Sequence, residues 1–252
     1  VRDILLIRTA YIGDVIMTLP MLKPLRQRFP AARLSFLTAP AAAPLLAGSP
    51  YVDEVLTFAS PWFYPAARGG YWRFIREIRR RKFDLVIEAR ADIRELFAFV
   101  APLKARYKVS YDVGGGGYLL THVVPYPGLK HKVEYHLDMA RFLGCEVAYP
   151  LDWGLRLTEA ERLAGERMLA EQGIAKPFLC VHPGGRLLLK RWPVERYAAL
   201  CDQVAARFNW PVVVLGAADE GELAARLIAG MRARAVSLAG KLTMRELGGL
   251  LG

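Results

Sequence analysis

Short apolar runs alternate along the chain with longer segments whose apolar residues recur at helical spacing. Runs of strand length predict buried β-strands, and the segments between them predict amphipathic helices. This βα alternation predicts an α/β protein with parallel sheets. We expect strands near residues 4–8, 33–38, 52–58, 84–88, 106–110, 178–182, 211–215 and 235–238.

The segment between residues 111 and 130 differs from this pattern. It contains four consecutive glycines, Gly114 to Gly117, and is expected to be a long mobile loop, either a substrate lid or an idle surface loop. Helices are expected near residues 14–29, 41–47, 70–82, 92–101, 132–143, 159–173, 194–208, 219–233 and 243–251.

The βα pattern restarts after residue 176, which predicts two Rossmann-like units. The expected division is an N-terminal domain over residues 1–158, a linker helix over 159–175 and a second domain over 176–252. The second domain has only three βα units, about half of a doubly wound sheet. We therefore expect this domain to be incomplete at its C-terminal end.

Composition narrows the class of protein. The chain is 54% hydrophobic and 23% charged, as in a globular protein and not a disordered one. Its cysteines, Cys145, Cys180 and Cys201, show no metal-ligand spacing, which favours a reducing compartment and argues against structural zinc. Without an apolar run of about 18 residues or the features of a signal peptide, the sequence favours the cytoplasm.

The net charge of +11 predicts attraction to an anionic partner. Seven basic residues lie between Arg68 and Lys82 against the single acid Glu77, with aromatic residues interleaved. Such a segment is typical of a basic helix at an anionic membrane face or at a charged sugar acceptor, and equally of a solvated helix face. No recognition motif supports nucleic-acid binding.

The strand near 4–8 runs into Gly13 and Asp14, which open a helix. Ligands of open α/β sheets bind at the carboxyl ends of strands, so Asp14 is a helix N-cap, a general base facing a cleft, or both, since the two roles do not exclude each other. Gly13 would allow a substrate to approach the backbone closely. Arg8, at the strand end, would bind an anionic group or pair with a local acid.

A second strand of this kind, early in the second unit, leads into Gly184 and Gly185. The free amides of this turn, together with Arg186, Lys190 and a helix N-terminus, suit a diphosphate; a solvated surface turn is the alternative. Glu220 follows the next strand, where acids often take ribose hydroxyls, although an acid there also favours the helix dipole.

Two motifs, in order and spacing, resemble those of the lipopolysaccharide heptosyltransferase family, glycosyltransferase family 9. The resemblance runs over essentially the whole chain. It implies a GT-B architecture with two Rossmann-like domains facing a cleft, the acceptor on the first domain and the nucleotide-sugar on the second. The matching residues are Ile7-Arg8, Gly13-Asp14-Val15, Thr18-Leu19-Pro20, His182-Pro183-Gly184 and Lys190-Arg191-Trp192-Pro193.

The resemblance also implies an activity: inverting transfer of heptose from ADP-heptose to the Kdo/heptose inner core of lipopolysaccharide. Asp14 would be the general base, with no metal or cofactor beyond the donor substrate. The implied setting is the inner face of the Gram-negative inner membrane, with an anionic lipid-linked acceptor and peripheral membrane contact. The implied donor-binding residues are Gly184, Gly185, Arg186, Lys190 and Glu220, and the implied acceptor-binding residues are Arg8, Thr9, Gly13, Arg90, Arg94 and His131.

Several positions depart from the family pattern on the acceptor side. Ala10 and Tyr11 replace small hydroxyl residues, Met17 stands where histidine is frequent, and the segment 88–94 differs from the best-known members. A family loop of the form D-(S/T)-G-x-x-H would lie beyond Gly252. A different sugar acceptor, a non-catalytic sugar-nucleotide-binding module and a basic membrane-surface or nucleic-acid-binding protein are therefore kept as alternatives.

Overall fold

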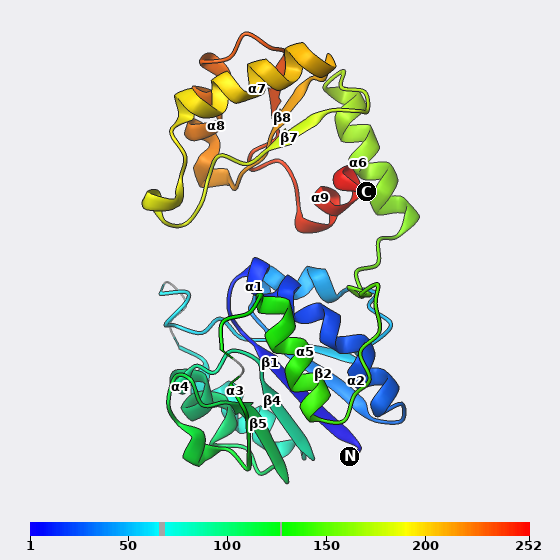
Figure 1. Cartoon of the computed structure of the whole chain (residues 1–252), viewed down its shortest axis with the longest axis vertical. Helices are drawn as coiled ribbons and strands as arrows, with labels where there is room; N and C mark the ends of the chain where they lie inside the picture. Colours follow the sequence, from blue (N-terminus) through cyan, green and yellow to red (C-terminus); the bar gives the residue numbers. More distant parts are fainter. Residues whose placement is uncertain (66–68, 127) are drawn as a thin grey trace. The chain divides into compact units, whose positions relative to one another are not determined.

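A computed structural model describes residues 1–65, 69–126 and 128–252 (Figure 1). The chain divides into two compact units, Val1–Arg156 and Leu157–Gly252. The division thus falls two residues before the expected domain end at 158. Residues 159–175, expected as a linker, belong to the C-terminal unit because their helix packs against the last helix of the chain.

The N-terminal unit is built on a parallel six-stranded sheet in the order β3-β2-β1-β4-β5-β6. This is the order of a doubly wound fold, with the first strand in the middle. The central strand is apolar along its length because both of its faces are covered. The strands are β1 (Asp3–Arg8), β2 (Arg33–Thr38), β3 (Glu54–Thr57), β4 (Leu85–Glu88), β5 (Tyr107–Tyr111) and β6 (His122–Val124).

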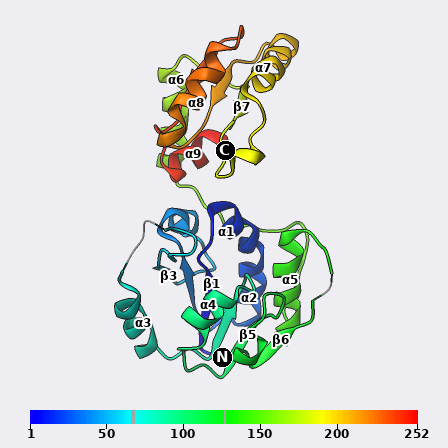
Figure 2. The same cartoon turned by 90° about the vertical axis from the view of Figure 1, so that its left-hand side faces the viewer.

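Helices cover both faces of this sheet. On one face α1, α2 and α5 pack together, and on the other lie α3 and the α4–η3 segment (Figure 2). The helix expected over 14–29 is divided at its prolines into three short pieces. The elements are α1 (Ile12–Thr18), η1 (Leu19–Met21), α2 (Leu22–Arg28), η2 (Pro40–Leu46), α3 (Tyr71–Arg80), α4 (Ile93–Glu95), η3 (Leu96–Val100), η4 (Gly117–Leu119) and α5 (Lys132–Phe142).

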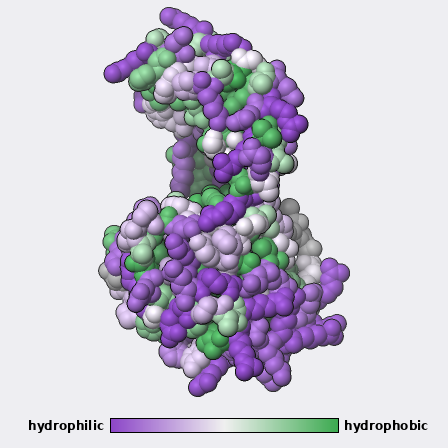
Figure 3. Space-filling model, turned by 90° about the vertical axis from the view of Figure 1, so that its right-hand side faces the viewer, coloured by the Kyte–Doolittle hydropathy of each residue, from purple (hydrophilic) through white to green (hydrophobic). Residues whose placement is uncertain are grey.

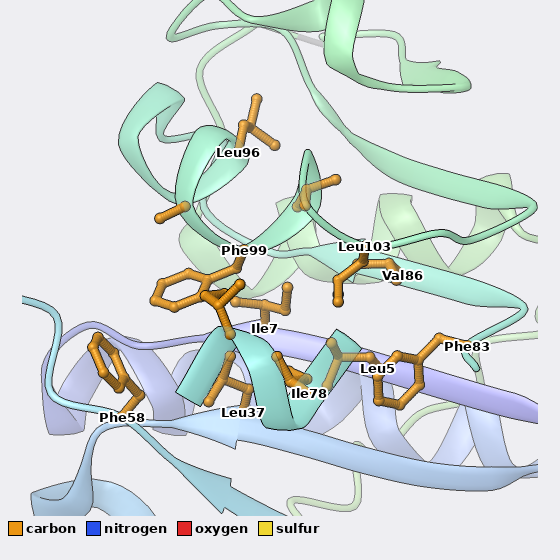
Figure 4. Packing of buried hydrophobic residues seen from close by; sticks show 13 residues of the cluster. Leu5, Ile7, Leu37, Phe58, Ile78, Phe83, Val86, Leu96, Phe99 and Leu103 are labelled. Carbon is orange, nitrogen blue, oxygen red and sulfur yellow. The ribbon is translucent and has the colours of Figure 1, made fainter. Parts of the chain in front are cut away.

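An aromatic and aliphatic cluster fills the space between the sheet and α3 (Figure 4). Leu5 and Ile7 point into it from β1, since alternate residues of a strand face the same side. Phe58 stacks on Phe74 with ring centroids 4.8 Å apart, and Phe99 meets Phe58 edge-on. This cluster anchors α3 by its apolar side and leaves its other side to solvent.

The prediction of a long mobile loop over residues 111–130 is wrong in two respects. It contains η4 and β6, which adds a sixth parallel strand beside β5. Its glycines are also closely packed: a Cβ at Gly114 would collide with the carbonyl oxygen of Ala91, and one at Gly117 with Asp112. These glycines therefore permit close backbone packing, and only Pro127 of this segment lies outside the described residues.

The C-terminal unit has a parallel three-stranded sheet in the order β7-β8-β9. Helix α9 packs on α6 almost backbone to backbone, because a Cβ at Gly165 would collide with the backbone of Gly249 and Leu250. The predicted α/β class, with parallel sheets in both units, is confirmed. The elements are α6 (Glu159–Glu171), β7 (Leu179–Val181), η5 (Leu188–Lys190), α7 (Val194–Phe208), β8 (Val212–Val214), η6 (Ala218–Glu220), α8 (Gly221–Ala229), β9 (Ala235–Ser237) and α9 (Met244–Leu251).

The surface of the N-terminal unit shown in Figure 3 is mostly hydrophilic, with apolar residues between the charged ones. Within the described ranges, every helix is too short or too polar to cross a bilayer.

Candidate functional site: an acidic group beside buried arginine

Asp14 lies in the first turn of α1, directly beyond the carboxyl end of β1. The N-cap of this helix is Tyr11, so the alternative in which Asp14 caps the helix is wrong. Its Oδ1 instead lies 3.0 Å from Nη2 of Arg8, and its Oδ2 lies 3.9 Å from Nη1 of Arg90. The Asp14 side chain is 31% exposed, so its carboxylate is held by cations while remaining accessible.

Arg8 is the buried centre of this arrangement, with only 4% of its side chain exposed. It ends β1, and its Nη1 donates a 2.9 Å hydrogen bond to the carbonyl oxygen of Ala89, just past the end of β4. The neighbouring strands β1 and β4 are parallel, so their carboxyl ends meet at one edge and bring these groups together. Arg8 therefore pairs with Asp14, which was one of its two predicted roles.

Glu88, the last residue of β4, holds the loop that carries Arg90. Its fully buried carboxylate accepts hydrogen bonds from the backbone N–H groups of Arg90 and Ala91 and from the Ser110 hydroxyl, at 2.9, 2.7 and 2.7 Å. Burial, with the nearby Glu95 carboxylate, raises the pKa of Glu88 to about 8. The loop then turns through Ala91, whose φ of 63° is left-handed.

Glu95, in α4, is a second buried acid behind the site. It accepts a hydrogen bond from the Thr9 hydroxyl, which also lies 2.7 Å from the Ser60 hydroxyl. Burial raises the pKa of Glu95 as well, and Glu95 shares a hydrogen bond with Glu88. Near neutral pH this pair therefore retains a proton. Thr9, predicted to contact acceptor, lies buried in this supporting network.

A cavity of about 520 Å³ opens beside Asp14 within the N-terminal unit. Both cations and tyrosines line it, and the rings of Tyr126 and Tyr135 stack with an interplanar angle of 7°. Such a wall of aromatic faces and positive charge suits a sugar that bears acidic groups. The lining residues are Arg8, Asp14, Ala89, Arg90, Ala91, Tyr111, Val113, Tyr126, Leu129, Lys130, Lys132, Tyr135 and His136.

His136 is the buried histidine of this cavity. Its Nε2 lies 3.3 Å from the Thr18 hydroxyl, and burial, with the positive charges of Arg8 and Lys132, lowers its pKa to about 3. The imidazole is therefore neutral at physiological pH. The predicted acceptor residue His131 instead caps α5, where its Nδ1 accepts a hydrogen bond from the Val133 amide.

Of the other predicted acceptor residues, Arg90 lines the cavity, whereas Arg94 and Gly13 are not among its lining residues. The Arg90 guanidinium stacks 4.1 Å from the Phe63 ring centroid, and Arg94, at 5.3 Å from the same ring, forms a forked pair with Asp92. Gly13 is exposed, and a Cβ there would meet no neighbour within 4 Å. The sequence analysis missed the cavity residues that come from α5 and from the segment before it. Two lysines close to a tyrosine, Lys130 and Lys132 beside Tyr135, are the sequence feature that could have indicated them.

The corresponding edge of the C-terminal unit is organised by Glu220. Its carboxylate accepts hydrogen bonds from the backbone N–H groups of Gly185 and Ala217, each at 2.9 Å, and lies 3.0 Å from Nε2 of His182. Burial opposes ionisation of Glu220, but the bonds from Ala217, His182 and Gly185 outweigh it and hold its pKa below the usual range. Glu220 thus ties the loop after β7 to the loop after β8.

The glycine turn predicted to face phosphates packs against this acid. A Cβ at Gly184 would collide with the Glu220 carboxylate, which explains glycine at that position. Arg186 and Lys190 lie exposed further along the same loop, Lys190 at the end of η5. Arg191 donates from Nε to the Gly185 carbonyl oxygen at 2.8 Å. The five predicted donor residues therefore belong to one edge of the sheet.

Residues of metal-binding type do not gather in groups of three or more in the part of the chain that the structure describes.

Comparisons with known proteins agree with this arrangement. The family model described as glycosyltransferase family 9 (heptosyltransferase) matches residues 71–252. Lipopolysaccharide heptosyltransferase 3 of Escherichia coli is 25% identical over 255 residues, which cover 95% of this chain and 72% of that protein.

Two solved structures show the same fold. The family 9 glycosyltransferase of Veillonella parvula superposes with a TM-score of 0.80 at 19% identity, covering 99% of this chain and 72% of that one. The Escherichia coli heptosyltransferase WaaC with ADP gives a TM-score of 0.75 at 18% identity, covering 99% and 78%. These likenesses confirm the predicted GT-B fold class. Because the family model covers most of its length, the chain belongs to glycosyltransferase family 9, the heptosyltransferase family, and is a sugar-transferring enzyme.

Proposed function

We propose that the enzyme transfers heptose from ADP-heptose to the Kdo/heptose inner core of lipopolysaccharide, with inversion at the anomeric carbon. The observation that supports this most is the setting of Asp14. Among the described residues that line the cavity of the N-terminal unit, Asp14 is the only carboxylate, and Arg8, Arg90, Lys130 and Lys132 are cationic. One base in a positively charged cavity suits an anionic sugar acceptor.

In this proposal Asp14 accepts the proton of the acceptor hydroxyl. The freed oxygen attacks the anomeric carbon of the donor while the bond from that carbon to the diphosphate oxygen breaks and ADP leaves. Arg8 holds the Asp14 carboxylate in place. Arg90, 3.9 Å from the same carboxylate, takes part in binding the acid groups of the acceptor. Most of the catalytic effect then comes from positioning and charge.

For the donor side we propose that Arg186 and Lys190 neutralise the leaving diphosphate, with Gly184 and Gly185 beside the phosphates and Glu220 near the ribose. The exposed positions of the two cations on one loop support this role. ADP is favoured as the nucleotide because the solved relative WaaC contains ADP. We further propose that the reaction needs no metal or cofactor beyond the donor.

We place the working enzyme in the cytoplasm, at the inner face of the inner membrane of a Gram-negative bacterium, because a lipid-linked acceptor would be met there. Peripheral contact with that membrane is part of the proposal. Its physical basis is the positive charge of the chain.

The test is a transfer assay by mass spectrometry, with ADP-heptose and Kdo-lipid A, in the longest natural form of the protein. Asp14→Ala should lower the rate roughly 10²–10⁴-fold, the usual contribution of a general base. The matched control is Asp3→Ala, at the amino end of β1 and away from the cavity, which should keep the wild-type rate.

Two results would contradict the proposal. Transfer by Asp14→Ala at the wild-type rate would remove the general base. If the wild-type protein binds ADP but transfers sugar to no Kdo-bearing or phosphorylated acceptor, the alternative of a sugar-nucleotide-binding module would replace it.

A further inference from the structure

Helix α3 presents a strongly basic face to solvent. Arg73, Arg76, Arg79 and Arg80 are all exposed, and within the described ranges none of them forms an ion pair. The opposite side of the helix, through Ile75 and Ile78, is buried in the core cluster of the N-terminal unit. The basic face is therefore fixed to a packed helix and carries four arginines against the single acid Glu77.

A single aromatic residue accompanies these charges. Trp72 is 77% exposed, although its ring meets Tyr71 edge-on at 5.1 Å. Residues three and four apart on a helix are neighbours, so Trp72, Arg76 and Arg79 form one row along the exposed side. Glu77 is the only acid in α3, and Arg68, part of the basic segment in the sequence, lies outside the described residues.

We propose that this face of α3 docks the enzyme onto an anionic lipid surface. Arginines attract acidic headgroups, and tryptophan favours the boundary between headgroups and acyl chains. A helix face is convex, which suits a flat membrane. A single-stranded nucleic acid would instead need a groove with several aromatic platforms, and α3 has one exposed aromatic residue on its basic face.

The position of α3 connects this surface to the site. Its first turn lies beside the carboxyl end of β3, because Tyr71 and Phe74 both contact Phe58, the residue just after that strand. The Asp14 cavity lies at the carboxyl ends of β1 and β4 in the same parallel sheet. Figure 2 shows α3 at the outer side of the unit, away from α5. Docking through α3 would bring this edge near the membrane.

The inference deepens the proposed function, and rests on it only in supposing that the acceptor is lipid-linked. The test is co-sedimentation of the full chain with phosphatidylcholine vesicles, with and without phosphatidylglycerol. Wild type should bind only the anionic vesicles. The fourfold variant Arg73→Gln/Arg76→Gln/Arg79→Gln/Arg80→Gln should bind them weaker by a factor on the order of 100 or more.

The matched control removes the same charge from the C-terminal unit: Arg162→Gln/Arg167→Gln/Arg196→Gln/Arg207→Gln, all at exposed helix positions. It should keep most of the binding. Trp72→Phe should abolish the blue shift of tryptophan fluorescence that anionic vesicles cause. Circular dichroism spectra matching wild type would show that the variants are folded.

Three results would overturn the proposal: no binding of wild type to anionic vesicles, equal losses in the α3 variant and the control, or tighter binding of an oligonucleotide than of vesicles through the same arginines. The assay contains neither donor nor acceptor. Asp14→Ala should bind vesicles as wild type does, so failure of docking and failure of transfer are separate outcomes.

Discussion

In the N-terminal unit, Asp14 follows β1, and its carboxylate opens onto the cavity beside Arg8. In the C-terminal unit, Glu220 follows β8, and its carboxylate turns back onto the Gly185 amide and His182. Both acids occupy the carboxyl edge of a parallel sheet. The contacts differ because Asp14 is bound by side chains that leave it accessible, whereas Glu220 satisfies backbone amides of its own loops.

The comparison shows that position in the fold does not decide what an acid does. The N-terminal edge has buried charged groups behind it, Arg8, Glu88 and Glu95, which hold the accessible carboxylate and its loop. At the C-terminal edge the acid itself holds the loop. A functional role therefore follows from what supports the group and from what remains free to meet a ligand.

The largest effect is expected from removing the buried cation. Arg8→Met leaves Asp14 without its closest partner and the Ala89 carbonyl oxygen without its donor, which should cost about 3–5 kcal/mol of unfolding free energy. Denaturant unfolding measures this. The control Arg156→Met, which removes an exposed pair with Asp152, should cost about 1 kcal/mol or less. Equal costs would contradict the supporting role of the buried Arg8.

A smaller effect on stability is expected from substituting one glycine at each edge, Gly184 and Gly13. Gly184→Ala forces the Glu220 carboxylate to move and should destabilise the C-terminal unit by about 1–3 kcal/mol. Gly13→Ala places its methyl group in open space at the start of α1 and should be neutral or stabilising by up to about 1 kcal/mol. Thermal unfolding of both variants would test this, and the reverse order would show that Glu220 does not hold its loop.

The pH dependence of stability sharpens the comparison further. The folded pKa of Glu88 is raised to about 8, so its contribution to stability is complete below pH 4.5 and is lost as the pH rises through 8. The folded pKa of Glu220 is lowered, so its contribution is present above pH 4.5 and is lost on acidification. Glu88→Gln should therefore flatten the profile between pH 4.5 and 8, and Glu220→Gln should flatten it below pH 4.5.

Unfolding free energies measured across this pH range give both slopes in one experiment. A Glu88→Gln profile that runs parallel to wild type between pH 4.5 and 8 would mean that the buried pair does not hold a proton.

Much of the fold could be predicted from sequence because the central strands β1, β4 and β8 are largely apolar runs that are buried on both faces. The expected strand near 33–38 coincides with β2, that near 84–88 begins one residue before β4, and that near 106–110 is offset from β5 by one residue at both ends. Strand β6 was missed because it is short, half exposed and preceded by glycines. The run of glycines predicts a mobile loop, whereas Gly114 is needed for close contact with the Ala91 carbonyl oxygen.

The site was only partly predictable, for a physical reason. Arg8, Asp14 and Arg90 come together because they follow adjacent parallel strands, which sequence order can suggest. The roles of Thr9 and His131 depended on which side chain turns inward, and one is buried against Glu95 while the other caps α5. No spacing in the sequence indicates such local choices.

The most direct test of the account is the separate measurement of kcat and the KM for ADP-heptose in Asp14→Asn and Glu220→Gln. Asp14→Asn should lose kcat and keep its KM, because the donor is proposed to bind on the other unit. Glu220→Gln should raise KM and largely keep kcat, because the loop proposed to hold the diphosphate is loosened. A loss of kcat in Glu220→Gln with Asp14→Asn unaffected would contradict the account.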